Sequence, residues 1–226
     1  LNKMSQLIIT EGVTWELLVV NNNSLDNTEE VLKKYEPVLP LKRLNETALG
    51  IGNARNCALR EASGDYIIWT DDDAFVEKEW LVEYCNAFRR FPDTVLFGGT
   101  IDPFFEGEPP DWLKKVFPSV MNYYTVVDRG QDGIKLNPEL LPYAANYAVR
   151  AKEHFKYYYN PNLGRKGDVL SGGEETDLFE RLLKDGFDGR WVPKARVKHY
   201  ISKERQTITY LRKTIYDRHK VAANFL

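Results

Sequence analysis

Cysteine is nearly absent from this sequence of 226 residues, which holds only Cys57 and Cys85. Both lie among apolar neighbours in segments of helical pattern, without the paired spacing of a zinc site, so we expect buried thiols in a reducing compartment. An excess of one charge is missing as well. Because 31 Lys and Arg residues face 33 Asp and Glu residues, the composition argues against nucleic acid as the main partner.

Long apolar runs are also missing. No stretch of about 18 apolar residues could span a bilayer, and the first residues lack the layout of a signal peptide. We therefore expect a soluble, cytoplasmic chain. The segment from Thr207 to Leu226 has the pattern of a basic amphipathic helix, which is compatible with a solvated face, with peripheral contact at the inner face of a membrane, or with a cover over the site.

Three consecutive acids, Asp71, Asp72 and Asp73, directly follow a short apolar run from Tyr66 to Thr70. The run is rich in β-branched and aromatic residues and too short for a helix, which predicts a buried strand. Ligands of open α/β sheets bind beyond the carboxyl ends of such strands, and carboxylates there suit a divalent cation. Capping of the following helix would need only one acid. The pattern favours a metal site.

The remaining pattern predicts an α/β fold with a mostly parallel central sheet flanked by helices. Its first half, up to about residue 100, alternates strands and helices, whereas residues 102 to 145 are rich in proline and lack a sustained period. We expect an irregular region there. Expected helical segments are the chain start up to Thr10, Thr28 to Tyr35, Gly50 to Ala62, Ala74 to Phe91 and Arg150 to Tyr159; expected strands are Trp15 to Val20, Val95 to Gly99 and Tyr143 to Val149.

Three further polar groups are candidates for chemistry. The loop from Asn21 to Thr28 follows a predicted strand, although its short side chains also favour turns and caps. Arg55 lies off the apolar stripe of its helix, where it could grip a phosphate or an acidic loop, or simply be solvated. His199 follows a strand-like alternation, and a lone histidine of this kind gains weight only if a metal lies nearby.

A second acidic cluster, Glu174, Glu175 and Asp177, opens a predicted helix after Gly172 and Gly173. Ser171 and Glu174 have the spacing of a capping box, and acids in a first helical turn are favoured in any case. Against this, capping needs fewer acids, and the glycines allow another molecule to approach the backbone. A carboxylate here could deprotonate a hydroxyl. The pattern weighs the two interpretations equally.

Taken together, these motifs resemble those of the family 2 glycosyltransferases of the GT-A fold. The resemblance spans roughly residues 1 to 200 and depends on the joint order of Leu18 to Thr28, Gly50 to Asn56, Gly64 to Asp73, Gly98-Gly99, Asn146 with Arg150, Leu163-Gly164, Gly173 to Leu178 with Arg181, and Pro193 to His199. It implies a single domain over residues 1–226. Residues 1–100 would form the half that binds the nucleotide-sugar, and residues 101–226 the half that binds the acceptor and carries the catalytic acids.

The resemblance also implies roles for individual residues. The donor would be a UDP-sugar, with Asn21, Asn23, Arg55, Asp71 and Asp72 on its nucleotide side. Asp73, Asp71 and His199 would hold Mg2+ or Mn2+. Glu175 occupies the position of the catalytic base, where the family more often has Asp, and this leaves open whether Glu174, Glu175 or Asp177 accepts the proton. The reaction would be an inverting transfer to a hydroxyl of a glycan or lipid-linked acceptor.

The acceptor side is the least defined. Trp112 could form an aromatic wall for a sugar ring or belong to the core, and Gly173 could leave room for the acceptor. The first strand of the fold is expected to be missing from the sequence, and the family typically has Asp where this chain has Asn21. Two other functions stay open: a nucleotidyltransferase that makes sugar nucleotides, and a non-catalytic carbohydrate-binding module that would be expected to lose the acids kept here. The sugar, the linkage and the oligomeric state are not defined by the sequence.

Overall fold

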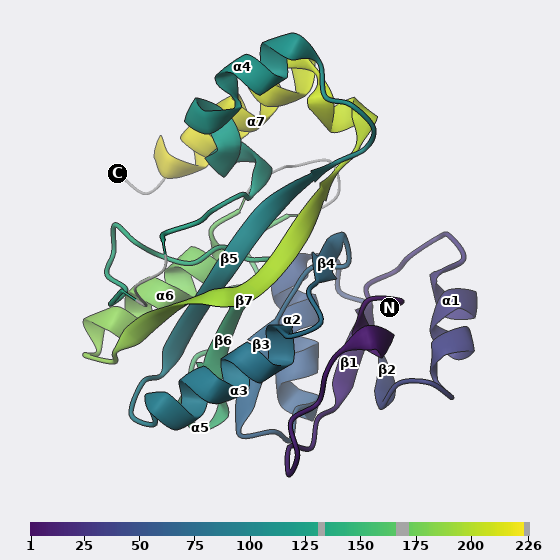
Figure 1. Ribbon diagram of the computed structural model, residues 1–226, viewed down its shortest axis with the longest axis vertical. Helices are drawn as coiled ribbons and strands as arrows, with labels where there is room; N and C mark the ends of the chain where they lie inside the picture. The colour runs from purple at the N-terminus through teal and green to yellow at the C-terminus, as the bar shows by residue number, and fades with distance from the viewer. Residues whose placement is uncertain (131–133, 166–171, 224–226) are drawn as a thin grey trace.

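A computed structural model describes residues 1–130, 134–165 and 172–223 of the chain, with side chains described up to residue 218. Its main sheet has five strands in the order β3-β6-β5-β7-β4, and a separate parallel pair, β1 and β2, lies beside it (Figure 1). The strands are β1 Leu17–Asn21, β2 Leu41–Asn45, β3 Tyr66–Trp69, β4 Ala74–Val76, β5 Leu96–Phe105, β6 Tyr147–Arg150 and β7 Gly189–Ile201.

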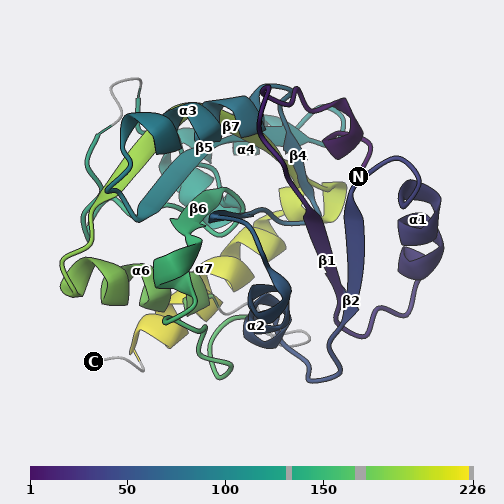
Figure 2. The same ribbon diagram turned by 90° about the horizontal axis from the view of Figure 1, so that it is seen from below.

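Helices lie on both faces of the main sheet (Figure 2), with α3 on one side and α2 and α6 on the other. The α-helices are α1 Thr28–Tyr35, α2 Ile51–Glu61, α3 Trp80–Arg90, α4 Asp111–Val120, α5 Ala151–His154, α6 Glu174–Lys184 and α7 Ile208–Ala223, and the 3₁₀ helices are η1 Met4–Gln6, η2 Met121–Tyr124 and η3 Lys203–Gln206. The predicted α/β class with flanking helices is confirmed. Within the described residues, no helix is both long and apolar enough to cross a bilayer.

The sheet is mixed, which corrects the expectation of a mostly parallel one. Among the neighbouring strands of the main sheet, β5 and β7 pair in parallel, whereas β6 is antiparallel to both β3 and β5, and β4 is antiparallel to β7. Strands β3, β5 and β7 therefore run in one direction, and β6 and β4 run in the other. The expectation of a parallel sheet came from the alternation of strands and helices in the first half of the chain. Strands β1 and β2 of that half, however, form a separate pair. The antiparallel strands β6 and β4 are only four and three residues long, and strands this short carry little periodicity.

The core explains why the strands form where they do. Leu96 to Ile101 are buried without a break, as expected for a strand covered on both faces, whereas β7 alternates between buried and partly exposed positions. The side chain of Asn146, which is fully buried, ties these strands together. It accepts hydrogen bonds from Trp80 and Tyr84 and donates to the carbonyl oxygens of Thr100 and Ala195, at 2.8–2.9 Å.

Several predicted segments differ from the structure, and the helix predicted from Arg150 to Tyr159 is only the four-residue α5. The segment predicted as one helix from Ala74 to Phe91 is strand β4 followed by α3, and the chain start forms only the short helix η1. The region from 102 to 145 is less irregular than predicted, since β5 runs on to Phe105 and α4 follows. Helix α4 contains Pro118 inside it, and prolines are what masked its pattern.

Helices α4 and α7 pack together at one end of the long β5/β7 ribbon, apart from the main body (Figure 1). They enclose a second apolar core, whose buried members are Leu113, Tyr124, Val126 and Ile201. We call this part of the molecule the α4–α7 layer, comprising α4, η2, η3 and α7. The predicted helix in the basic tail is confirmed as α7.

Candidate functional site

The aspartate triplet follows the end of β3, as predicted, and then turns straight into β4. The amide of Ala74 donates to the carbonyl of Asp71 at 3.2 Å, and the amide of Tyr200 donates to the carbonyl of Asp73 at 2.9 Å. Because β4 pairs with β7 in the register Ala74 opposite His199, this turn brings His199 beside the acids from 126 residues further along the chain. The register of one short strand pair therefore assembles the site.

Asp71, Asp73 and His199 form a cluster that could hold a metal ion. One ligand atom from each lies within 4.8 Å of the others, and Nε2 of His199 is 3.3 Å from Oδ1 of Asp73. Nδ1 of His199 is 2.8 Å from the carbonyl of Tyr124 and must donate to it, so Nε2 is left free to ligate. Carboxylate oxygens with a neutral imidazole suit Mg2+ or Mn2+. Asp72 is exposed and lies outside this cluster.

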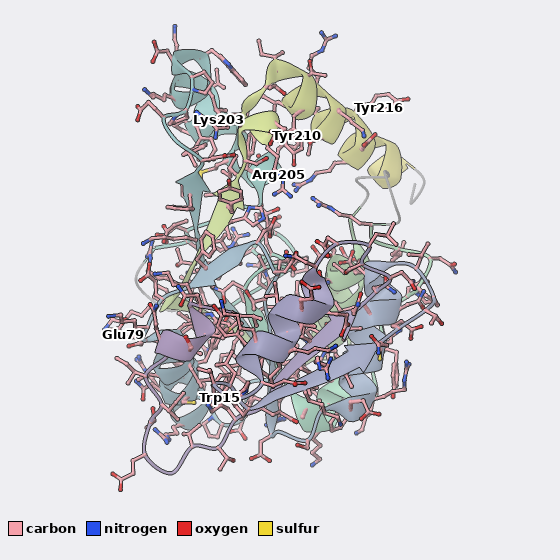
Figure 3. The ribbon with its side chains drawn as sticks, turned by 90° about the vertical axis from the view of Figure 1, so that its right-hand side faces the viewer. Trp15, Glu79, Lys203, Arg205, Tyr210 and Tyr216 are labelled. Atoms are coloured by element: carbon pink, nitrogen blue, oxygen red, sulfur yellow. The ribbon has the colours of Figure 1, made fainter. Side chains whose placement is uncertain are left out.

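Asp73 has a second cationic neighbour that the sequence did not single out. Nη1 of Arg205, from η3, lies 2.9 Å from Oδ2 of Asp73. Burial alone would raise the pKa of Asp73, but its neighbours His199 and Arg205 outweigh burial and lower the pKa to about 2. Figure 3 shows Arg205 directed toward the body of the molecule, while Tyr216 points away from it. The carboxylate is therefore ionised throughout the physiological range.

Arg55 lies deeper than the prediction of a nucleotide contact implied. Its side chain is 6% exposed, with Nη1 2.7 Å from Glu174 and Nη2 3.5 Å from Asp71. The guanidinium also lies 5.5–5.9 Å from the ring centroids of Trp69, Tyr147 and Tyr159. Such an aromatic cage stabilises a cation. Arg55 therefore connects the aspartate loop to helix α6.

The three acids of α6 have different surroundings. Glu174 is buried and paired with Arg55, and burial together with Glu175 raises its pKa to about 7. Asp177 pairs with Arg181 one turn further along, at 2.8 Å. Glu175 is partly buried, and its Oε2 has no hydrogen-bond partner among the described residues. Oε2 of Glu174 is likewise buried and unpartnered among these residues, so Glu175 differs from the other two acids in forming no salt bridge among the described residues, whereas Glu174 pairs with Arg55 and Asp177 with Arg181.

The capping-box interpretation of helix α6 depends on a residue that the structure does not describe. Ser171 lies outside the described residues, and the N-cap is Gly173, which has a φ of 108° and no side-chain cap. A residue with a side chain is strained at this φ. Among the described residues, a Cβ at Gly173 would meet no atom within 4 Å, and the role of Gly173 beside an acceptor stays a prediction.

The asparagine loop after β1 is held mainly by its own side chains. Asn21 donates to Glu29 at 2.8 Å, and Asn23, with a φ of 64°, donates to the carbonyl of Thr47 at 2.8 Å. Asn22 donates to the carbonyls of Glu46 and Ala48 and accepts from the amide of Gly50. These bonds brace the loop that leads into α2. They reach residues 8 to 28 positions along the chain, so they are not local turn or cap bonds, and contact with a nucleotide stays a prediction.

Trp112 lies in α4 and packs against the second core. These contacts match the core alternative for this residue, and its stacking on an acceptor stays a prediction. Sequence reasoning missed Arg205, the carbonyl of Tyr124 and the aromatic cage around Arg55. Only a pairing of distant segments brings these groups to the site, and no local pattern signals such pairing.

The sequence profile described as "Glycosyl transferase family 2" matches residues 5–158, about two thirds of the chain. The chain therefore belongs to glycosyltransferase family 2. It is 24% identical over 201 residues to a glucosyl-dolichyl phosphate glucuronosyltransferase of Haloferax volcanii, covering 87% of this chain and 62% of that protein. It is 24% identical over 218 residues to the succinoglycan biosynthesis protein ExoM of Rhizobium meliloti, covering 94% of this chain and 65% of that protein.

Solved structures show the same fold. TarS of S. aureus in complex with UDP matches with a TM-score of 0.61 at 17% identity, covering 96% of this chain and 59% of that one. GalNAc-T7 with UDP, GalNAc and Mn2+ matches with a TM-score of 0.60 at 16% identity, covering 89% of this chain and 41% of that one. The chain thus spans less than two thirds of the length of each of these relatives.

Proposed function

We propose that the protein transfers a sugar, with inversion, from a nucleotide-sugar donor to a hydroxyl of a glycan or lipid-linked acceptor. Family membership supports the reaction class. UDP-sugar is the proposed donor, since fold relatives were solved with UDP, and the names of relatives that act on dolichyl phosphate and diphosphoundecaprenol carriers support a lipid-linked acceptor. The observation that carries the proposal is the link, through Arg55, between the cluster of Asp71, Asp73 and His199 and the acids of α6.

Asp71, Asp73 and His199 would hold Mg2+ or Mn2+. The cation, when bound, neutralises the charge that develops on the departing diphosphate. Residues 1–100 form the donor half in this proposal, with Asn21, Asn23 and Asp72 on its nucleotide side. Residues 101–226 form the acceptor and catalytic half, with Gly173 and Trp112 on the acceptor side. Action in the cytoplasm, in peripheral contact with the inner face of a membrane, is part of the same proposal.

We assign the base to Glu175. Glu174 forms a salt bridge with Arg55 and Asp177 forms one with Arg181, whereas Glu175 forms none among the described residues. Oε2 of Glu175 is buried and has no hydrogen-bond partner among those residues, as is also true of Oε2 of Glu174. Glu175 takes the proton of the acceptor hydroxyl while the hydroxyl oxygen bonds to the anomeric carbon. The bond from that carbon to the diphosphate oxygen breaks on the opposite face, which inverts the anomeric centre.

Release of UDP from a panel of UDP-sugars, measured with purified protein, tests the assignment. We expect release with at least one donor, dependent on Mn2+ or Mg2+ and abolished in Asp73→Ala. Consumption of a nucleoside triphosphate with a sugar phosphate would instead indicate a nucleotidyltransferase. Sugar binding that needs no metal and gives no turnover would indicate a binding module.

A further inference from the structure

Helix η3 is a short, firmly anchored element at the end of β7. Its residue Gln206 is buried, and Nε2 of that side chain donates to the carbonyl of Glu106 at 3.0 Å and to the carbonyl of Ile201 at 2.9 Å. The amide of Lys203 donates to the carboxylate of Glu106 at 2.8 Å. These bonds tie η3 to the ends of both β5 and β7. The position of Arg205 is therefore fixed by the fold.

The guanidinium of Arg205 is held at two points. Nη1 is 2.9 Å from Oδ2 of Asp73 and 3.3 Å from the carbonyl of Tyr200. Both side chains of the ion pair are about three quarters buried, with 25% of Arg205 and 27% of Asp73 exposed. An exposed ion pair does little to fix the positions of its two side chains, because its attraction is screened by solvent and salt and its formation costs side-chain entropy. This pair differs, since its cation is anchored to the backbone.

The two oxygens of Asp73 have different partners. Oδ2 accepts from Arg205, while Oδ1 lies 3.3 Å from Nε2 of His199, the nitrogen that is free to ligate. Arg205 therefore occupies one oxygen and leaves the other on the side of the metal cluster. Partners of this kind fix the orientation of a ligating carboxylate, and their loss typically weakens metal affinity by about 10- to 100-fold.

We propose that Arg205 is a positioning residue for Asp73, holding Oδ2 so that Oδ1 is oriented toward the metal site. The proposal rests on the metal-dependent function proposed above. It also predicts that removal of Arg205 changes the affinity for Mn2+ in the direction opposite to that expected from charge repulsion alone. A cation that acted only through its charge would repel Mn2+, so its removal would tighten binding. Loss of positioning weakens it.

Binding of Mn2+ to the purified protein, measured by electron paramagnetic resonance with and without UDP, distinguishes positioning from charge repulsion. We expect Arg205→Gln to bind Mn2+ about 10- to 100-fold more weakly than the wild type. Arg205→Lys keeps the charge but has a single donor group, so its affinity for Mn2+ should lie between those of the wild type and Arg205→Gln. Arg212→Gln, an equal change of charge at an exposed position of α7, should bind like the wild type.

Equal or tighter Mn2+ binding by Arg205→Gln would overturn the proposal, as would a wild type that shows no saturable Mn2+ binding. Thermal unfolding of each variant provides the check on folding. A loss of stability in Arg205→Gln at unchanged Mn2+ affinity would make Arg205 merely structural. Failure of the transferase assignment has a different signature, because metal binding would then persist without any release of UDP from UDP-sugars.

Discussion

Two arginines hold the acids of this site, and they do so in different ways. Arg55 is 6% exposed, surrounded by three aromatic rings, and bridges Asp71 and Glu174. Arg205 is 25% exposed and holds Asp73 alone. The Arg55 pair is desolvated, so removing one partner leaves a buried, uncompensated charge. The Arg205 pair keeps some solvent, so its loss should change metal binding more than folding.

The arginines also divide the acids by role. Glu174 and Asp71 have their charge balanced by Arg55, Asp73 has its charge balanced by Arg205, and neither arginine contacts Glu175 among the described residues. A base has to be available to its substrate, and a paired acid is not. The contrast between the two regions is the reason for proposing Glu175 as the base, and the loss of that residue should affect chemistry more than folding.

The largest effect is expected for Glu175→Gln, which removes the base and conserves the shape of the side chain. We expect turnover with donor and acceptor to fall by about 100- to 10,000-fold, since general base catalysis typically contributes this much. The measurement is kcat for sugar transfer, with Glu180→Gln, at an exposed position of the same helix, as the matched control. Near-normal transfer by Glu175→Gln would return the role to Glu174 or Asp177.

Arg55→Met should destabilise the fold more than Arg205→Met does. It leaves Glu174 buried without its counter-charge, and we expect a loss of about 3–5 kcal/mol in the free energy of unfolding. Arg205→Met should lose no more than about 1 kcal/mol, because its pair is partly solvated. Urea unfolding of both variants at pH 7 gives the comparison. Equal losses would mean that the two pairs do not differ as described.

A buried histidine near Arg55 should make the stability of this side of the site depend on pH. His154 is fully buried and accepts a hydrogen bond from Trp69 at 3.0 Å, and burial lowers its pKa from 6.5 to about 4. The folded state thus binds this proton more weakly than the unfolded state. The contribution of neutral His154 to stability is complete above about pH 6.5 and is lost as the pH falls toward 4.

At pH 5 about 1.5 pKa units of that shift are realised, so the loss relative to pH 7.5 is about 2 kcal/mol. Glu174, whose pKa is raised in the folded state, changes stability in the opposite direction over the same interval in both proteins. We therefore expect the free energy of unfolding of the wild type to change by about 2 kcal/mol relative to that of His154→Gln between pH 7.5 and pH 5, with the wild type the more destabilised. Urea unfolding at several pH values measures the slope for each protein. Parallel slopes would show that His154 is not the group responsible.

The smallest effect is expected for Asp177→Asn. Its pair with Arg181 joins successive turns of α6, with about a third of each side chain exposed, and such pairs contribute about 0.3–0.5 kcal/mol. Transfer activity should stay within about threefold of the wild type, because that energy corresponds to a small factor in any equilibrium. Thermal unfolding and kcat measure both. A large loss of kcat at unchanged stability would place Asp177 in the chemistry.

Local patterns were sufficient for much of the fold. The helix predicted from Thr28 to Tyr35 is confirmed as α1, and the strand before the aspartates is confirmed to within one residue as β3. The prediction that this strand is buried was wrong, because β3 lies at the edge of the sheet and its residues are partly exposed. The acids after β3 and His199 converge as expected for a metal site. These successes share a cause: apolar periodicity and turn residues act over a few positions, and the sequence displays them directly.

The remainder depended on pairing between distant segments. The strand β4 is three residues long and forms against β7, so its own residues suggested the start of a helix. Arg205 reaches Asp73 across 132 positions of sequence, and the α4–α7 layer is defined by a second core that joins β5, α4 and α7. Tertiary contacts override local preference at such places.

The central claim is that Asp71, Asp73 and His199 bind a divalent cation at the end of β3. Anomalous diffraction at the manganese edge, from crystals grown with Mn2+ and UDP, tests it most directly. We predict a single strong peak within coordination distance of all three side chains. A map without a peak there, or with manganese bound elsewhere, would contradict the account.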